Sequence, residues 1–216
     1  SLEVLCLACF RPLYKLEWRK NLKLSDLYIK IKKIQINDPL IEKNEIRKLP
    51  VLSALANKTS KKVRKQYEEN PYPRWVGIGI KNERNTIKKV IELIGLNANL
   101  ECLESVKCPD ILIAGCGTGQ HSIQTARTYK DCNVLAIDLS SASLAYAKRK
   151  TKELKIHNID YLQGDILKLG DLGRSFDIIE CVGVLHHMRD PLEGWKLLVK
   201  FLRPKGLLRV GLYSSL

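Results

Sequence analysis

The 216-residue sequence lacks any apolar run approaching the roughly eighteen residues that a membrane-spanning helix needs. The apolar stretch from Leu2 to Phe10 is interrupted by Glu3, follows no basic residues and precedes no small-residue cleavage site, so it predicts a packed helix rather than a signal peptide. The seven cysteines are an odd number, which argues against a disulfide framework and indicates a reducing compartment. Cys6-x-x-Cys9 has no second such pair and no nearby histidine pair, so we expect no metal.

Charge is present in excess of one sign, with 37 Lys and Arg against 23 Asp and Glu and a formal net charge of +14. Such a balance can indicate a nucleic acid or an acidic partner. The basic residues are spread along expected helices and are not gathered with aromatic residues into a binding motif. The pattern therefore disfavours nucleic acid as the partner.

The most informative segment is Ile111–Gly119, an apolar run that breaks into three glycines at alternate positions, Gly115, Gly117 and Gly119. A helical stretch follows, and a second apolar run, Val134–Asp138, ends in an acid. Strand, glycine turn, helix, strand and terminal acid together predict a nucleoside-binding βαβ unit. Glycine lets the backbone approach a ligand closely, and a carboxylate can accept hydrogen bonds from two ribose hydroxyls.

The spacing of the glycines indicates which nucleoside is bound. A dinucleotide fingerprint would need a third glycine at position 120, which is Gln120, and no lysine follows at the spacing of a phosphate-binding loop. The ligand therefore need not carry a pyrophosphate. A nucleoside with an amino-acid tail, S-adenosylmethionine, suits this turn better.

From about Gln66 to Tyr213 the sequence resembles a class I, S-adenosylmethionine-dependent methyltransferase. Five segments in order carry the resemblance: Ala114–Gly119, Ala136–Ser140, Gln163–Ile166, Phe176–Met188 and Leu202–Val210. The resemblance implies an α/β fold with a Rossmann-like, doubly wound and mostly parallel sheet. The alternation of patterns predicts strands near 111–114, 133–137, 159–162, 176–181 and 206–212, with helices near 119–130, 141–155 and 192–202.

Three regions are expected along the chain. Residues 1–62 predict a helical N-terminal region, 63–109 an aromatic lead-in segment and a helix, and 110–216 the methyltransferase domain. We expect the polar stretch 57–62 to be a linker, and Gln66–Trp75, dense in proline and aromatics, to be neither helix nor central strand. The final antiparallel strands usual in the family do not follow the fifth strand, which predicts a sheet truncated there and a piece of a longer chain.

The resemblance assigns the cofactor residues. Gly115, Gly117 and Gly119 would carry the methionine portion, Asp138 the ribose hydroxyls and Asp165 the adenine amine. Ile166 would pack on the adenine ring, and the expected cofactor set is completed by Cys116, Leu139 and Cys181. The family usually carries an acid two residues before the first glycine, where this sequence has Ile113. Gln120 and His121 are the nearby polar residues that would compensate.

Methyl transfer demands mainly that nucleophile, methyl and sulfur be held in line, with removal of a proton in some cases. The end of the fourth strand offers Glu180, His186 and His187 as catalytic candidates. Tyr72 is a fourth, because Gln66–Trp75 resembles a segment of a bacterial subgroup related to protein-lysine methyltransferases and to methyltransferases fused to tetratricopeptide repeats. A lid over the cofactor and a hydrophobic strap over the core are both open for that segment.

We expect a bacterial, cytoplasmic enzyme whose methyl acceptor is a protein lysine side chain. A small metabolite is the alternative acceptor. A third alternative is a module that binds the cofactor without turnover. The absence of an acid at Ile113 and of the final strands favours this alternative, and the intact Asp138, Asp165 and glycines oppose it.

Overall fold

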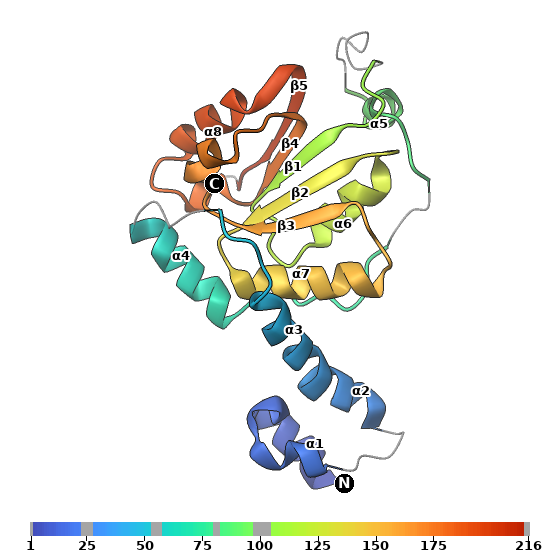
Figure 1. The fold of residues 1–216 in the computed structure, drawn as a ribbon, viewed down its shortest axis with the longest axis vertical. Helices are drawn as coiled ribbons and strands as arrows, with labels where there is room; N and C mark the ends of the chain where they lie inside the picture. The colour runs from blue at the N-terminus through green and yellow to red at the C-terminus, as the bar shows by residue number, and fades with distance from the viewer. Residues whose placement is uncertain (1, 23–27, 53–57, 80–82, 97–104, 214–216) are drawn as a thin grey trace. The chain divides into compact units, whose positions relative to one another are not determined.

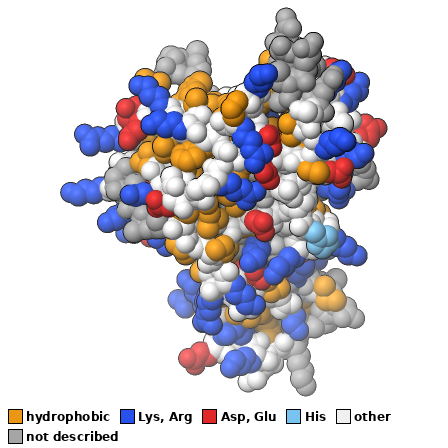
Figure 2. Space-filling model, turned by 45° about the horizontal axis from the view of Figure 1, so that its top comes forward, with side chains coloured by type: hydrophobic (Ala, Val, Ile, Leu, Met, Phe, Trp, Pro, Cys, Tyr) orange, Lys and Arg blue, Asp and Glu red, His pale blue; other side chains and the backbone are white. Residues whose placement is uncertain are grey.

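The computed structural model describes residues 2–22, 28–52, 58–79, 83–96 and 105–213. It divides into two compact units, Ser1–Lys48 and Leu49–Leu216. No helix in the described ranges is both long and apolar enough to cross a membrane. Figure 2 shows Lys and Arg side chains spread over many parts of the visible face.

The first unit is helical over its described residues. It contains α1 (Leu2–Phe10), the 3-10 turns η1 (Leu13–Lys15) and η2 (Glu17–Asn21), α2 (Ile29–Lys32), the π-helical turn η4 (Lys33–Asn37) and α3 (Asp38–Ile46). The Gln35 side chain joins two of these elements, because it accepts from the N–H of Leu13 and donates to the carbonyl of Ala8, each at 3.4 Å. Leu13 and Ile36 supply buried apolar side chains.

The second unit is built on a five-stranded parallel sheet with the order β3-β2-β1-β4-β5 (Figure 1). The strands are β1 (Asp110–Ala114), β2 (Asn133–Asp138), β3 (Ile159–Gln163), β4 (Phe176–Val182) and β5 (Leu202–Gly211). The helices are α4 (Lys58–Glu69), α5 (Ile87–Leu93), α6 (Gln120–Thr128), α7 (Ser141–Glu153) and α8 (Pro191–Lys200), with 3-10 segments η5 (Ile166–Leu172) and η6 (Leu185–His187). The predicted Rossmann-like α/β fold is confirmed.

Each face of the sheet has its own core, because successive strand residues point to opposite sides. Ile111, Ile113 and Ile178 pack with apolar residues of α5, α6 and α7. Leu112 and Ile179 pack with residues of η5, η6 and α8 on the other face. Strands covered on both faces read as continuous apolar runs, which is why the sequence located them well.

The fifth strand begins at Leu202, earlier than the predicted residue 206. Phe176 pairs with Leu202, and the register then shifts before Ile178 pairs with Leu207. Lys205 takes up the extra length at φ +67°. The irregularity therefore lies inside the strand.

Helix α4 corrects the expected linker at 57–62 and covers the first residues of the expected non-helical segment; Asn57 itself lies outside the described residues. Lys58–Glu69 contains no proline or glycine, and Thr59, Val63 and Tyr67 recur at helical spacing on one face. Lysines and an arginine occupy the other faces of the helix, and their polarity is why the sequence predicts a linker at 57–62. The helix ends before Pro71, as the restriction on residues preceding proline requires.

Candidate functional site

The glycine turn between β1 and α6 forms the floor of the site. Its three glycines have φ values of +80° (Gly115), +51° (Gly117) and +83° (Gly119), a region that side chains disfavour. At Gly117 an added Cβ would meet only the carbonyl oxygen of Tyr72, at 3.9 Å, so this glycine borders open space. The turn therefore leaves backbone accessible to a ligand at Gly117.

Asp138 lies at the end of β2, beside that turn. One carboxylate oxygen accepts from the N–H of Gly117 at 2.7 Å, and the other accepts from the N–H of Ser140 at 2.9 Å. Burial raises the pKa of the Asp138 carboxyl and the nearby Glu68 carboxylate raises it further, while the two N–H donors act in the opposite direction. The carboxylate is thus held in place by backbone groups and has lone pairs left for a ligand.

A pocket of about 510 Å³ opens above these residues, at the carboxyl ends of the strands. The chain runs from β1 to β2 and β3 on one side and returns to β4 and β5 on the other, so the pocket lies where the strand order reverses. Asp165 borders it and also accepts from the N–H of Leu167 at 3.0 Å, which caps η5. Its size is that of a pocket for a small cofactor.

The structure brings most of the sequence-predicted residues to this pocket. Gly115, Cys116, Gly117, Asp138, Leu139, Asp165, Ile166, Tyr72 and His187 line it. Gly119 instead packs against α7, with Ala147 and Tyr161 as its neighbours. Cys181 is fully buried in the core beneath α8 and η5, because it points to the opposite face of β4 from Glu180. His186 lies beside the pocket, between the rings of His187 and Tyr213 at 4.2 and 4.3 Å.

Burial and the charge of His187 lower the pKa of His186. Neither of its ring nitrogens has a hydrogen-bond partner among the described residues. The stacked position of His186 contrasts with that of His187, which faces the pocket itself.

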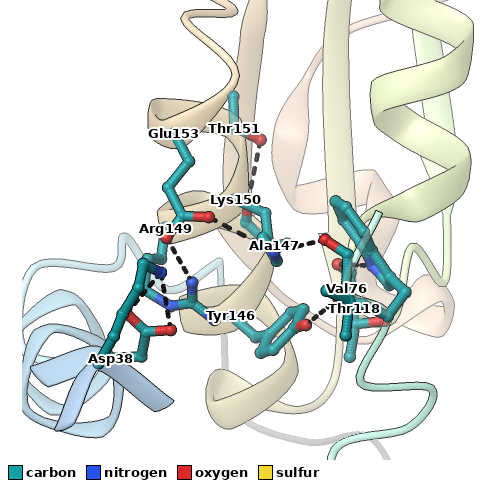
Figure 3. Close-up of polar contacts among 11 residues, drawn as sticks. Asp38, Val76, Thr118, Tyr146, Ala147, Arg149, Lys150, Thr151 and Glu153 are labelled. Atoms are coloured by element: carbon teal, nitrogen blue, oxygen red, sulfur yellow. Dashed lines mark hydrogen bonds and ion pairs between the residues drawn. The ribbon is translucent and has the colours of Figure 1, made fainter. Parts of the chain in front are cut away.

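The aromatic segment is fastened to the glycine turn at its C-terminal end. Trp75 is buried, donates from Nε1 to the carbonyl of Thr118 at 3.0 Å, and meets the ring of Tyr146 edge-on. Tyr146 donates its hydroxyl to the carbonyl of Trp75, and Lys150 donates to that of Val76 at 3.0 Å (Figure 3). Tyr72, by contrast, is 74% exposed at the pocket rim. The segment therefore has an anchored end and an open end.

Glu180 and His121 contact each other beside the pocket. His121 Nε2 lies 2.9 Å from Glu180 Oε2, which also accepts from the hydroxyl of Thr125 at 2.6 Å. Arg209 approaches the other oxygen at 3.4 Å. Burial alone would raise the pKa of Glu180, but the His121 ring, the Thr125 hydroxyl and Arg209 together hold it below its usual range. His121 and Arg209 line the pocket, whereas Glu180 supports them from within.

Sequence reasoning did not find the contribution of α4. Thr59, Ser60, Val63 and Tyr67 of this helix line the pocket. Glu68 accepts from the N–H and hydroxyl of Ser141 at 2.8 and 2.9 Å and from the N–H of Ala142 at 3.1 Å, so it binds the N-terminus of α7. Burial raises the pKa of Tyr67, and Asp138 and Tyr213 raise it further. No local pattern signals these contacts.

Fold and site together define a Rossmann-like domain with a pocket at the switch point of its sheet. Comparison with known proteins is more specific. Residues 111–206 match a family model described as a methyltransferase domain. The uncharacterized protein syc1184_c of Synechococcus sp. is 36% identical over 109 residues, which are 50% of this chain and 26% of that protein. Trans-aconitate 2-methyltransferase of Deinococcus radiodurans is 34% identical over 96 residues, 44% of this chain and 34% of that enzyme.

Among solved structures, the [4+2]-cyclase SpnF has a TM-score of 0.51 at 21% identity, over 73% of this chain and 61% of that one. This likeness shows the fold. The chain spans only about a quarter to a third of the two relatives by sequence. Residues 111–206 are therefore similar in sequence to methyltransferase domains.

Replacing Asp138 by alanine is expected to weaken binding of S-adenosylhomocysteine by about 1.5 to 3 kcal/mol, the range for losing a charged hydrogen-bond partner. Because the pKa of Asp138 is raised, its carboxylate takes up a proton at a higher pH than an ordinary aspartate. Affinity of the parent protein should therefore fall as the pH falls through that raised value. Calorimetry across pH checks both expectations. Asp138→Asn is the control, and a pH dependence that persists in it would assign the effect to another group.

Proposed function

We propose that the protein transfers a methyl group from S-adenosylmethionine to an amine, and that the acceptor is a lysine side chain of a protein. The observation that carries the transfer is the fixed carboxylate of Asp138 beside the open backbone of Gly117. The residues present suit the cofactor, because they offer acceptors for hydroxyl and amine donors and leave space where a side chain would intrude. When bound, the cofactor supplies a methyl group on a sulfonium, which is already a good leaving group.

The residues of the chain then bind, orient and exclude water. Asp138 would accept from the ribose hydroxyls and Asp165 from the adenine amine. Ile166 offers an apolar surface for the ring, and α4 with Tyr67 covers the pocket. Proximity of this kind is a large part of what a methyl transfer needs.

The amine acceptor is supported by the rim of the pocket. Tyr72 and Tyr213 are 74% and 77% exposed and line the pocket, as do Asp190 and Glu193. Aromatic faces and carboxylates both attract ammonium groups. His187 at this rim would take up the proton that the amine releases. Arg189 also lines the pocket, and an acidic residue next to the target lysine would complement it.

Binding is tested first. Calorimetry is expected to show S-adenosylmethionine and S-adenosylhomocysteine bound more tightly than NAD or ATP. The turn has Gln120 where a dinucleotide fingerprint needs a glycine, and it lacks the lysine of a phosphate-binding loop. Tighter binding of NAD would refute the assignment.

The acceptor is tested next, with cofactor labelled on its methyl group and a bacterial lysate separated into proteins and small molecules. Label is expected in the protein fraction and, after hydrolysis, in methylated lysine. Label confined to small molecules would identify a metabolite methyltransferase. Cofactor binding with no transfer to either fraction would identify an inactive module. A bacterial and cytoplasmic setting is part of the same proposal.

A further inference from the structure

Resting on the proposed function, we propose that His121, held by Glu180, binds the α-ammonium group at the amino-acid end of the cofactor. The sequence offered Gln120 and His121 as residues that would compensate for the acid missing at Ile113, and the contact with Glu180 favours His121. The pair lies beside the glycine turn, and its two members come from elements that flank the pocket floor, α6 and β4.

Neighbouring side chains keep the buried carboxylate of Glu180 ionised. Its residue is only 4% exposed, yet its carboxylate has His121, Thr125 and Arg209 as partners. A buried carboxylate without partners would be costly, so these contacts fix both its charge and its position. The Glu180 carboxylate therefore interacts with His121 and is shielded from solvent.

His121 contacts Glu180 and also lines the pocket. Its Nε2 faces Glu180 and is shielded from solvent, while the residue as a whole lines the pocket. A carboxylate next to Nε2 places the proton of the neutral ring on that nitrogen, which leaves the lone pair on Nδ1. A neutral imidazole supported in this way accepts a hydrogen bond from an ammonium group.

The position of the pair matches the direction in which the cofactor must extend. Asp138 and Asp165 follow β2 and β3, so they fix the adenosine on that side of the sheet. A tail that crosses the glycine turn then reaches β4, where Glu180 lies level with Ile113 of β1. Ile113 is the position where the resemblance leads one to expect an acid, and Glu180 supplies a carboxylate one strand away.

The acceptor side of the pocket is separate. His187, Asp190 and Glu193 follow the end of β4, beyond Gly183, whereas Glu180 lies within the strand. This placement favours the cofactor tail over the acceptor as the partner of His121.

The test compares two ligands, S-adenosylhomocysteine and 5′-methylthioadenosine, which lacks the amino-acid end. Both contact Asp138 and Asp165, so the ratio of their affinities reports only on the tail. In His121→Leu we expect S-adenosylhomocysteine to bind about ten- to a hundredfold more weakly, with 5′-methylthioadenosine changed less than about twofold. Glu180→Gln should give a smaller loss of the same kind. His157→Leu, an exposed histidine outside the pocket, is the matched control.

His121→Gln, which keeps a polar side chain, serves if the leucine variant unfolds.

An unchanged ratio in the folded His121 variants would overturn the proposal, as would equal loss of both ligands. A parent protein that binds both ligands equally well would also overturn it, because the tail would then have no subsite. Failure to bind either ligand would instead refute the proposed function.

Discussion

Replacing Trp75 by alanine is expected to lower the free energy of unfolding by about 3 to 5 kcal/mol, the range for truncating a buried tryptophan. The indole is only 8% exposed, packs in the core with Tyr146, and donates to the carbonyl of Thr118 at 3.0 Å. Its loss would leave a cavity and an unpaired carbonyl beside the glycine turn. Urea unfolding followed by circular dichroism measures the change. Trp75→Phe, which keeps most of the volume, should lose clearly less.

Tyr72→Ala is the contrast within the same segment. The exposed ring contributes little to stability, so unfolding should change by less than about 1 kcal/mol. If the open end of the segment is a lid, turnover should nevertheless fall. Hydrogen exchange should then show the Trp75 amide protected with or without S-adenosylhomocysteine, and the Tyr72 amide protected only with it. Protection that does not change with the ligand would identify the entire segment as a strap.

The parts of the site that could be predicted from the sequence are those whose signal is local. The glycine turn, Asp138 and Asp165 each stand within a few residues of an apolar run, and the topology of the fold carries the ends of those runs to one edge. The strands were found for the same reason, since burial on both faces leaves a continuous apolar pattern.

The parts that could not be predicted depend on contacts distant in the sequence. Glu68 accepts from the N–H of Ser141 at the N-terminus of α7, 73 residues away. No local sequence pattern near Glu68 or Ser141 predicts this contact. The sequence predicts a linker at 57–62 because these residues are polar, whereas Lys58 begins α4 in the structure. Glu180 did carry a signal, a charge inside an apolar central strand. The structure was needed to identify His121, Thr125 and Arg209 as the partners of that charge.

Replacing Gly119 by alanine is expected to destabilise the protein by about 2 to 4 kcal/mol, from backbone strain at positive φ together with overpacking. Its φ is +83°, and an added Cβ would lie 2.5 Å from the Cβ and 3.0 Å from the Cα of Ala147. A backbone atom of α7 cannot move aside as a flexible side chain would, so α7 itself must shift away from the turn. Denaturant unfolding of the variant measures the cost.

Gly117→Ala separates this structural role from a ligand-binding one in the same turn. Gly117 also has a positive φ, +51°, but its added Cβ would have no neighbour closer than 3.9 Å. Strain alone should cost about 1 kcal/mol of stability, whereas the methyl group would occupy the space of the bound cofactor. We therefore expect Gly119→Ala to lose stability and Gly117→Ala to lose affinity for S-adenosylhomocysteine, with the larger affinity loss for Gly117→Val. Equal effects of the two alanine variants on both measurements would mean that the turn acts as a single structural unit, with no glycine reserved for the ligand.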